Sequence, residues 1–184
     1  MDTGIVLVIV LLVVIGAVAW ILMQRRRSEE LRERFGPEYQ RAVDELGDPQ
    51  RAESELAARE KRVEKFDIRP LTAQEHQRFT QAWRSAQSHF VDEPTATIKQ
   101  AERLVTDLMR TRGYPIADFD QRAADISVDH PNVVENYRAA RAIAIANERE
   151  AASTEQLRQA MVHYRALFED LLETNTPLEK EVGR

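Results

Sequence analysis

Four histidines, His76, His89, His130 and His163, are the side chains best suited to metal or acid–base chemistry, because the chain has no cysteine. None of them stands in a ligand spacing such as H-E-x-x-H, and no Glu-x-x-His motif of the di-iron bundles occurs. The absence of cysteine also excludes thiolate zinc sites, disulfides and cysteine nucleophiles. Capping, packing or surface exposure accounts for each histidine, so we expect no metal and no cofactor.

Four aspartates lie close together in the sequence, at Asp118, Asp120, Asp125 and Asp129. A calcium-binding EF-hand needs an oxygen ligand at its fifth position and glycine at its sixth, where this chain has Arg122 and Ala123. Helix capping and surface exposure explain the aspartates better. The sequence also lacks G-x-S-x-G, a P-loop and a dinucleotide fingerprint. These patterns identify no catalytic residue and favour a protein that is not an enzyme.

In a second interpretation, some of these polar residues form one binding site. His163 and Tyr164 on the last predicted helix, with the carboxylates of 118–130, could enclose a small ligand or a metal within a helical bundle. Trp83, with Phe79 and Phe90 at helical spacing, favours a core position over a ligand cage.

The charge pattern argues against a nucleic-acid binder. The chain has 26 Lys and Arg against 31 Asp and Glu, and both signs are interleaved along most of the sequence. A phosphate backbone would be repelled by such a surface. We therefore expect no nucleic acid among its partners. The expected partners are a lipid bilayer, for the reason given next, and another protein or a second copy of this chain.

The segment from Ile5 to Met23 contains nineteen residues without a charged side chain. About twenty apolar residues form a helix of roughly 30 Å, the thickness of the hydrocarbon layer. Trp20 suits the headgroup level, and Arg25, Arg26 and Arg27 follow at once. The positive-inside bias then predicts a single-pass cell-membrane protein with its N-terminus outside and its soluble domain in the cytoplasm.

A cleaved signal peptide is the alternative to this anchor. Ala17-Val18-Ala19 resembles a small-x-small cleavage site, and cleavage would leave the soluble domain exported. The chain starts with Met1-Asp2-Thr3, which includes no Lys or Arg, whereas a signal peptide begins with a basic segment. We favour the uncleaved anchor.

The rest of the chain predicts helices only. Four strongly patterned helices are expected at 72–91, 95–112, 131–149 and 154–173, with shorter ones at 37–46, 49–66 and 118–126. Thr72 and Glu75 form a capping-box pattern, and Gly113 ends the second strong helix. The thin apolar stripe of 49–66 predicts a solvent-facing helix.

The fold class is therefore all-α, with one N-terminal transmembrane helix followed by a soluble antiparallel helical bundle. The expected organisation is a transmembrane anchor at 1–24, a charged juxtamembrane helical segment at 25–66, a bundle domain at 67–173 and a polar tail at 174–184.

Several strings in the soluble part are distinctive, among them Phe35-Gly-Pro-Glu-Tyr39, Arg112-Gly-Tyr-Pro115, Arg122-Ala-Ala-Asp-Ile-Ser-Val-Asp-His-Pro131 and Arg158-Gln-Ala-Met-Val-His-Tyr-Arg165. Together they resemble a family of uncharacterised bacterial proteins, all-helical and often labelled membrane or secreted. The resemblance implies a bacterial source and membrane anchorage. It transfers no reaction, cofactor or functional residue.

These observations favour a membrane-anchored interaction or scaffolding module. The alternative is a helical bundle that binds a small ligand or a metal. The membrane-flanking residues Trp20, Arg25, Arg26 and Arg27 are the predicted functional positions.

Overall fold

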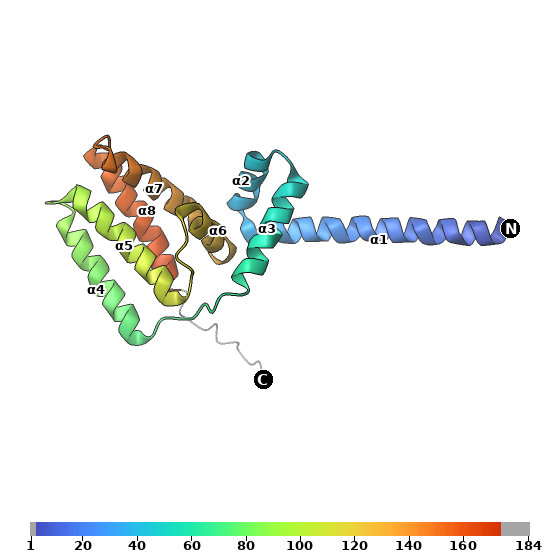
Figure 1. The fold of residues 1–184 in the computed structure, drawn as a ribbon, viewed down its shortest axis with the longest axis horizontal. Helices are drawn as coiled ribbons and strands as arrows, with labels where there is room; N and C mark the ends of the chain where they lie inside the picture. Colours follow the sequence, from blue (N-terminus) through green and yellow to red (C-terminus); the bar gives the residue numbers. More distant parts are fainter. Residues whose placement is uncertain (1–2, 174–184) are drawn as a thin grey trace. The chain divides into compact units, whose positions relative to one another are not determined.

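The computed structural model describes residues 3–173, and side chains from Leu11 onward. Every regular element in this range is an α-helix, and no strand occurs within it, which confirms the all-α prediction. The chain divides into two compact units, Met1–Ala57 and Ala58–Arg184 (Figure 1). The predicted polar tail at 174–184 lies outside the described residues.

The first unit begins with one uninterrupted helix, α1 (Thr3–Phe35). Gly36 ends it with a positive φ of 47°, and Pro37 opens the next helix, α2 (Pro37–Leu46), because proline fits the first helical turn. The third helix, α3 (Pro49–Val63), starts after Gly47 and Asp48. The helix predicted at 37–46 is therefore confirmed.

A small core joins these three helices. Leu31 and Phe35 from the end of α1 are almost fully buried, as are Tyr39 of α2 and Ala52 and Leu56 of α3. The prediction that 49–66 forms a solvent-facing helix is wrong, because Ala52 and Leu56 are both completely buried. A few apolar residues are enough to bury one side of α3, because Ala52 and Leu56 are four positions apart and lie on the same helical face.

The predicted anchor at 1–24 lies partly outside the described residues, because side chains are described only from Leu11. Among the residues that are described, no helix combines the length and the hydropathy expected of a membrane span.

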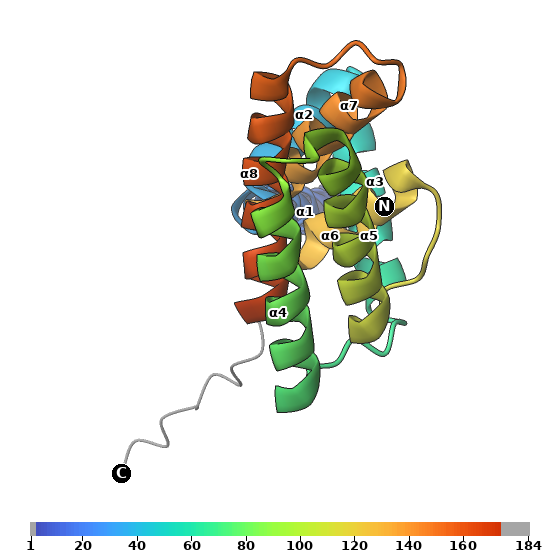
Figure 2. The same ribbon diagram turned by 90° about the vertical axis from the view of Figure 1, so that its left-hand side faces the viewer.

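The second unit contains five further helices, α4 (Ala73–His89), α5 (Pro94–Arg112), α6 (Phe119–Asp129), α7 (Val134–Glu148) and α8 (Thr154–Glu173). Four of them, α4, α5, α7 and α8, form a bundle (Figure 2). They correspond to the four strongly patterned segments of the sequence, and the prediction of a helical bundle is confirmed, although not every contacting pair in it is antiparallel. The short α6 connects α5 to α7.

Hydrogen bonds between helices give their directions. Glu102 of α5 pairs with Arg141 of α7, and Asn147 near the end of α7 donates to the Thr95 carbonyl near the start of α5. These two helices are therefore antiparallel. Arg112 at the end of α5 donates to the carbonyl of Leu171 near the end of α8, so α5 and α8 point the same way.

Stacked aromatic rings hold α4 on this bundle. Trp83 lies parallel to Phe168 of α8, with ring centroids 4.5 Å apart, and Phe79 meets Phe168 edge-on at 6.5 Å. Both α4 aromatics are buried, as their helical spacing predicts. Ring pairs of this kind add to the free energy gained by burying their large apolar surfaces.

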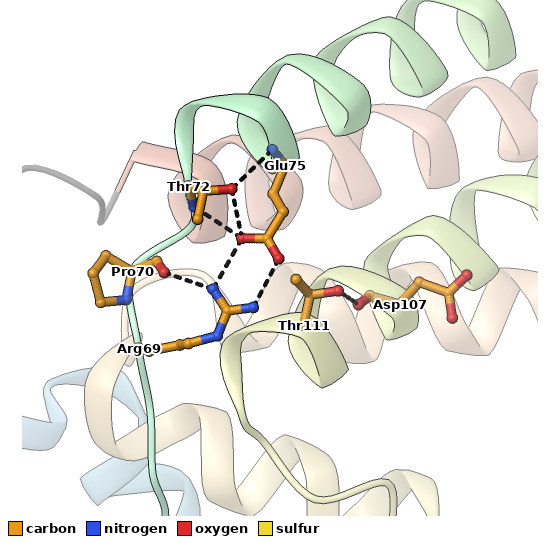
Figure 3. A network of polar contacts seen from close by, with 6 residues as sticks. All are labelled: Arg69, Pro70, Thr72, Glu75, Asp107 and Thr111. Carbon is orange, nitrogen blue, oxygen red and sulfur yellow. Dashed lines mark hydrogen bonds and ion pairs between the residues drawn. The ribbon is translucent and has the colours of Figure 1, made fainter.

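The start of α4 is a complete capping box, shown in Figure 3. Thr72 Oγ1 accepts from the Glu75 amide at 3.2 Å, and the Thr72 amide donates to Glu75 Oε2 at 2.8 Å. Arg69 binds both carboxylate oxygens of Glu75, at 2.9 and 2.7 Å. This arginine holds the pKa of Glu75 down, to about 2, with help from the Thr72 amide.

The end of α5 shows a close backbone approach. Gly113 has a φ of 101°, and a Cβ on it would lie 2.2 Å from the Asp67 carbonyl oxygen. The Arg69 amide donates to the Arg112 carbonyl at 2.9 Å in the same place. Only glycine fits between these two segments.

Candidate functional site

The described part of α1 exposes apolar side chains on every side. Ten large ones are between 48 and 68 % exposed: Leu11, Leu12, Val13, Val14, Ile15, Val18, Trp20, Ile21, Leu22 and Met23. An apolar surface of this extent is unusual on a water-soluble monomer and marks a place where another apolar phase or molecule binds. Trp20, a predicted membrane-flanking residue, is 68 % exposed in this run.

The basic flank lies on the same helix, without a break in between. Arg25, Arg26 and Arg27 are all exposed and continue α1 directly from the apolar run. The next residue, Ser28, donates to the Glu53 carboxylate of α3, which also accepts from the Tyr39 hydroxyl at 2.9 Å. The folded core of this unit therefore begins immediately beyond the three arginines.

A second feature lies in the bundle, where a groove of about 520 Å³ runs along one face of α5 toward α6 and α7. All of its lining side chains are polar or charged: Lys99, Glu102, Arg103, Thr106, Asp107, Arg110, Arg122 and Glu148. The six α5 residues recur at three- and four-residue steps, so they share one helical face. The volume is in the range of small-molecule sites.

Two lining residues of this groove, Glu102 and Arg122, are held by contacts with α7. Arg141 of α7 pairs with Glu102 at 2.7 Å, and Arg122 of α6 donates to the Tyr137 hydroxyl at 3.2 Å. Arg122 also donates to the Ala117 carbonyl at 3.1 Å. These contacts hold the guanidinium groups of Arg122 and Arg141 in fixed positions, whereas the guanidinium of an unpaired surface arginine is flexible.

Tyr164 of α8 lies fully buried behind these contacts. Its hydroxyl finds no hydrogen-bond partner among the described residues. Burial raises the pKa of Tyr164, and the charge of Glu102 raises it further, so the phenol keeps its proton at neutral pH. A buried hydroxyl without a hydrogen-bond partner is costly in free energy.

The outer wall carries cations that the fold does not neutralise. Asp107 is paired with Arg110 at 2.7 Å. Lys99 and Arg103, one turn apart on α5, are exposed and form no ion pair within residues 3–173. Glu148 is the remaining carboxylate of the lining. On a chain of net charge −5, this makes the groove locally cationic.

A separate polar cluster closes one end of the bundle. His130 is buried and its Nδ1 contacts the Asp170 carboxylate, while its Nε2 has no partner in the described part of the chain. Tyr114 lies edge-on to His130 and donates to Asp129 at 2.7 Å. Because His130 is the C-terminal cap of α6 and Asp170 belongs to α8, their contact joins these two helices.

The polar residues that the ligand-binding interpretation grouped do not meet. Asp118 caps α6 through the Gln121 amide, and Asp125 is buried against Arg62 at 2.7 Å. His163 pairs with Asn136 at 2.8 Å, away from those carboxylates. Within the described residues, no three His, Asp or Glu side chains come close enough to hold a metal ion.

The sequence reasoning missed the groove itself. Its signal was available, since Lys99, Arg103, Thr106 and Arg110 follow helical spacing. The same pattern is typical of an ordinary solvated helix face, so it did not stand out. The decisive partners, Arg122 and Arg141, come from two other helices and could only be placed by the fold.

Comparison of the chain with protein-family models, with curated proteins and with solved structures gives no match. Two features of the described chain bear on function, the exposed apolar side chains of α1 and the charged groove along α5.

Proposed function

We propose that this protein is a single-pass membrane-anchored helical module that holds its bundle at a bilayer surface for interaction with another membrane-associated molecule. The observation that carries the proposal is the run of exposed apolar side chains on α1, which continues without a break into a packed helical unit. The apolar segment from Ile5 to Met23 supplies the length that a bilayer requires.

The helix makes this tether short and stiff. Leu31, the first buried residue of the unit's core, lies only eight positions beyond Met23. At 1.5 Å per residue this is about 12 Å, close to the depth of a headgroup layer. A helical connection of this length keeps the unit near the headgroups, whereas a flexible linker would let it diffuse away.

The three arginines give the tether its direction. Arg25, Arg26 and Arg27 are exposed at the end of the apolar run, where they can contact anionic headgroups and retain the following segment in the cytoplasm. The resemblance to bacterial proteins that are often labelled membrane or secreted supports the anchor, whereas the secreted label conflicts with this direction. Confinement to a membrane raises the effective concentration of any partner confined there as well.

Membrane extraction of the full chain tests the anchor. We expect the wild-type chain to remain in the membrane pellet after alkaline carbonate treatment. A Val13→Arg, Val14→Arg double variant should move to the supernatant, because two charges at the centre of a span oppose insertion. A matched Arg84→Gln, Arg158→Gln variant alters two exposed arginines of the bundle and should stay in the pellet.

A reporter fused after Arg184 tests the orientation. A reporter that is active only in the cytoplasm should be active in this fusion, and replacing Arg25, Arg26 and Arg27 with glutamine should reduce that activity. Release of the wild-type chain by carbonate would refute the anchor. Reporter activity only on the outer side would refute the orientation and support export of the soluble domain.

A further inference from the structure

We propose that the groove along α5 is a binding site for a small organic phosphomonoester, held by Lys99 and Arg103 on one wall and by Arg122 on the other. This site is independent of the membrane anchor, because all of its residues belong to the unit Ala58–Arg184.

The arrangement of donors points to a phosphate. Lys99 and Arg103 are one turn apart on α5, and Arg122 enters from α6, so three cations approach the same volume from two directions. A tetrahedral phosphate accepts hydrogen bonds from several directions at once, whereas a carboxylate offers two coplanar oxygens. Arg122 is already oriented by Tyr137 and the Ala117 carbonyl, so it loses little conformational freedom on binding.

The remaining lining indicates a polar organic group attached to the phosphate. The groove volume of about 520 Å³ exceeds what a single inorganic anion fills. Thr106 and Glu148 offer acceptors for hydroxyl groups, and no apolar side chain belongs to the lining. Glu102 is neutralised by Arg141, so it does not repel an anion. A phosphorylated polyol fits this chemistry, and it could be either a soluble metabolite or the headgroup of a lipid.

Calorimetric titration of the detergent-solubilised full chain tests the site. The probe is glycerol 3-phosphate, and a second arm adds phosphatidic acid in mixed micelles, with phosphatidylcholine as its reference. We expect saturable binding of at least one phosphomonoester. A Lys99→Gln, Arg103→Gln double variant should weaken it by about tenfold or more, as the loss of a charged hydrogen bond does.

A matched variant controls for net charge. Lys65→Gln, Arg84→Gln also removes one lysine and one arginine, both exposed and outside the groove, and it should bind as the wild type does. Because Lys99 and Arg103 are exposed and have no ion pair in the described chain, the groove variant should keep the wild-type melting temperature.

The outcomes separate the two sources. Binding of glycerol 3-phosphate that depends on the groove residues assigns a soluble phosphomonoester. Binding of phosphatidic acid alone, with the same dependence, assigns a lipid headgroup. The proposal is overturned if neither probe saturates, or if the groove variant and its charge-matched control lose affinity equally. A failure of carbonate-resistant anchoring leaves these measurements intact, because they are made in detergent.

Discussion

The two compact units use their apolar residues in opposite ways. In Met1–Ala57 the described apolar side chains of α1 from Leu11 to Met23 are exposed, and the buried ones form a small core around Phe35. In Ala58–Arg184 the apolar residues form one continuous core around Phe168, and the surface features are charged. The first unit therefore presents an apolar surface along α1, and the second presents a charged groove.

Two helices, one from each unit, begin in different ways. The α4 helix of the second unit starts with a complete capping box that Arg69 reinforces. The α2 helix of the first unit starts at Gly36 with no side-chain cap and depends on Pro37 and on packing. The contrast holds for these two helices and not for every helix, since α5 and α7 of the second unit also begin without a side-chain cap and Asp48 caps α3. The two units should nevertheless respond differently to matched substitutions, because their cores are separate.

The largest difference should come from core truncation. Phe168→Ala removes a ring that contacts both Trp83 and Phe79, and we expect the second unit to lose about 3–5 kcal/mol of unfolding free energy. Phe35→Ala removes an equally buried ring from the first unit. Trp83 fluorescence during denaturation should report the first substitution and not the second. A Trp83 transition shifted equally by both would show that the units unfold as one.

Two glycines with positive φ give the next largest contrast. Gly113→Ala should destabilise the second unit by about 2–3 kcal/mol, because the new Cβ would collide with the Asp67 carbonyl in addition to the backbone strain. Gly47→Ala has the same strain but no atom within 4 Å, so about 1 kcal/mol is expected in the first unit. Hydrogen exchange of peptides from each unit measures both. Equal costs at the two positions would argue against the close approach at Asp67.

Two tyrosines of the second unit should respond in opposite ways when their hydroxyl groups are removed. Tyr164→Phe removes a buried hydroxyl that has no described partner, and we expect a gain of about 1 kcal/mol in unfolding free energy. Tyr114→Phe removes the donor to Asp129 and should lower that free energy by about 1 kcal/mol. Denaturant titration distinguishes the signs. A loss of stability in Tyr164→Phe would mean that this hydroxyl is hydrogen-bonded in solution.

The smallest effect concerns pH. Glu75 has a pKa lowered to about 2, from an ordinary value of 4.5, so its carboxylate contributes stability that is fully present above pH 4.5. That contribution should be lost as the pH falls from about 4.5 toward 2. Glu75→Gln should flatten the pH dependence of hydrogen exchange at the start of α4 and leave α2 unchanged. An identical pH profile in the variant would refute the role of the Arg69 pair.

Much of the second unit could be predicted from local patterns. The Thr72–Glu75 capping box, the stop at Gly113 and the Phe79–Trp83 stripe each involve residues within a few positions of one another. Helix boundaries and amphipathic faces depend on such short-range chemistry, so the sequence alone indicates them. The misjudged helix was α3, whose apolar stripe of alanine and leucine looked too thin to be buried.

The candidate groove could not be predicted in the same way. Glu102 and Arg141 are 39 positions apart, and Arg62 meets Asp125 across 63 positions. No periodicity relates residues at such separations. A helical pattern says which residues share a face, and it does not say which other face lies opposite.

The sequence by itself determined that the chain is helical, where most helices begin and end, and that an apolar run from Ile5 to Met23 precedes three arginines. Only the tertiary structure decided that α1 continues unbroken to Phe35, that Tyr164 is buried without a described partner, and that cations from α5 and α6 share one groove. The physical reason is the number of residues along the chain over which each interaction acts. Backbone hydrogen bonds and capping act over a few residues, whereas packing joins residues that are distant in the chain.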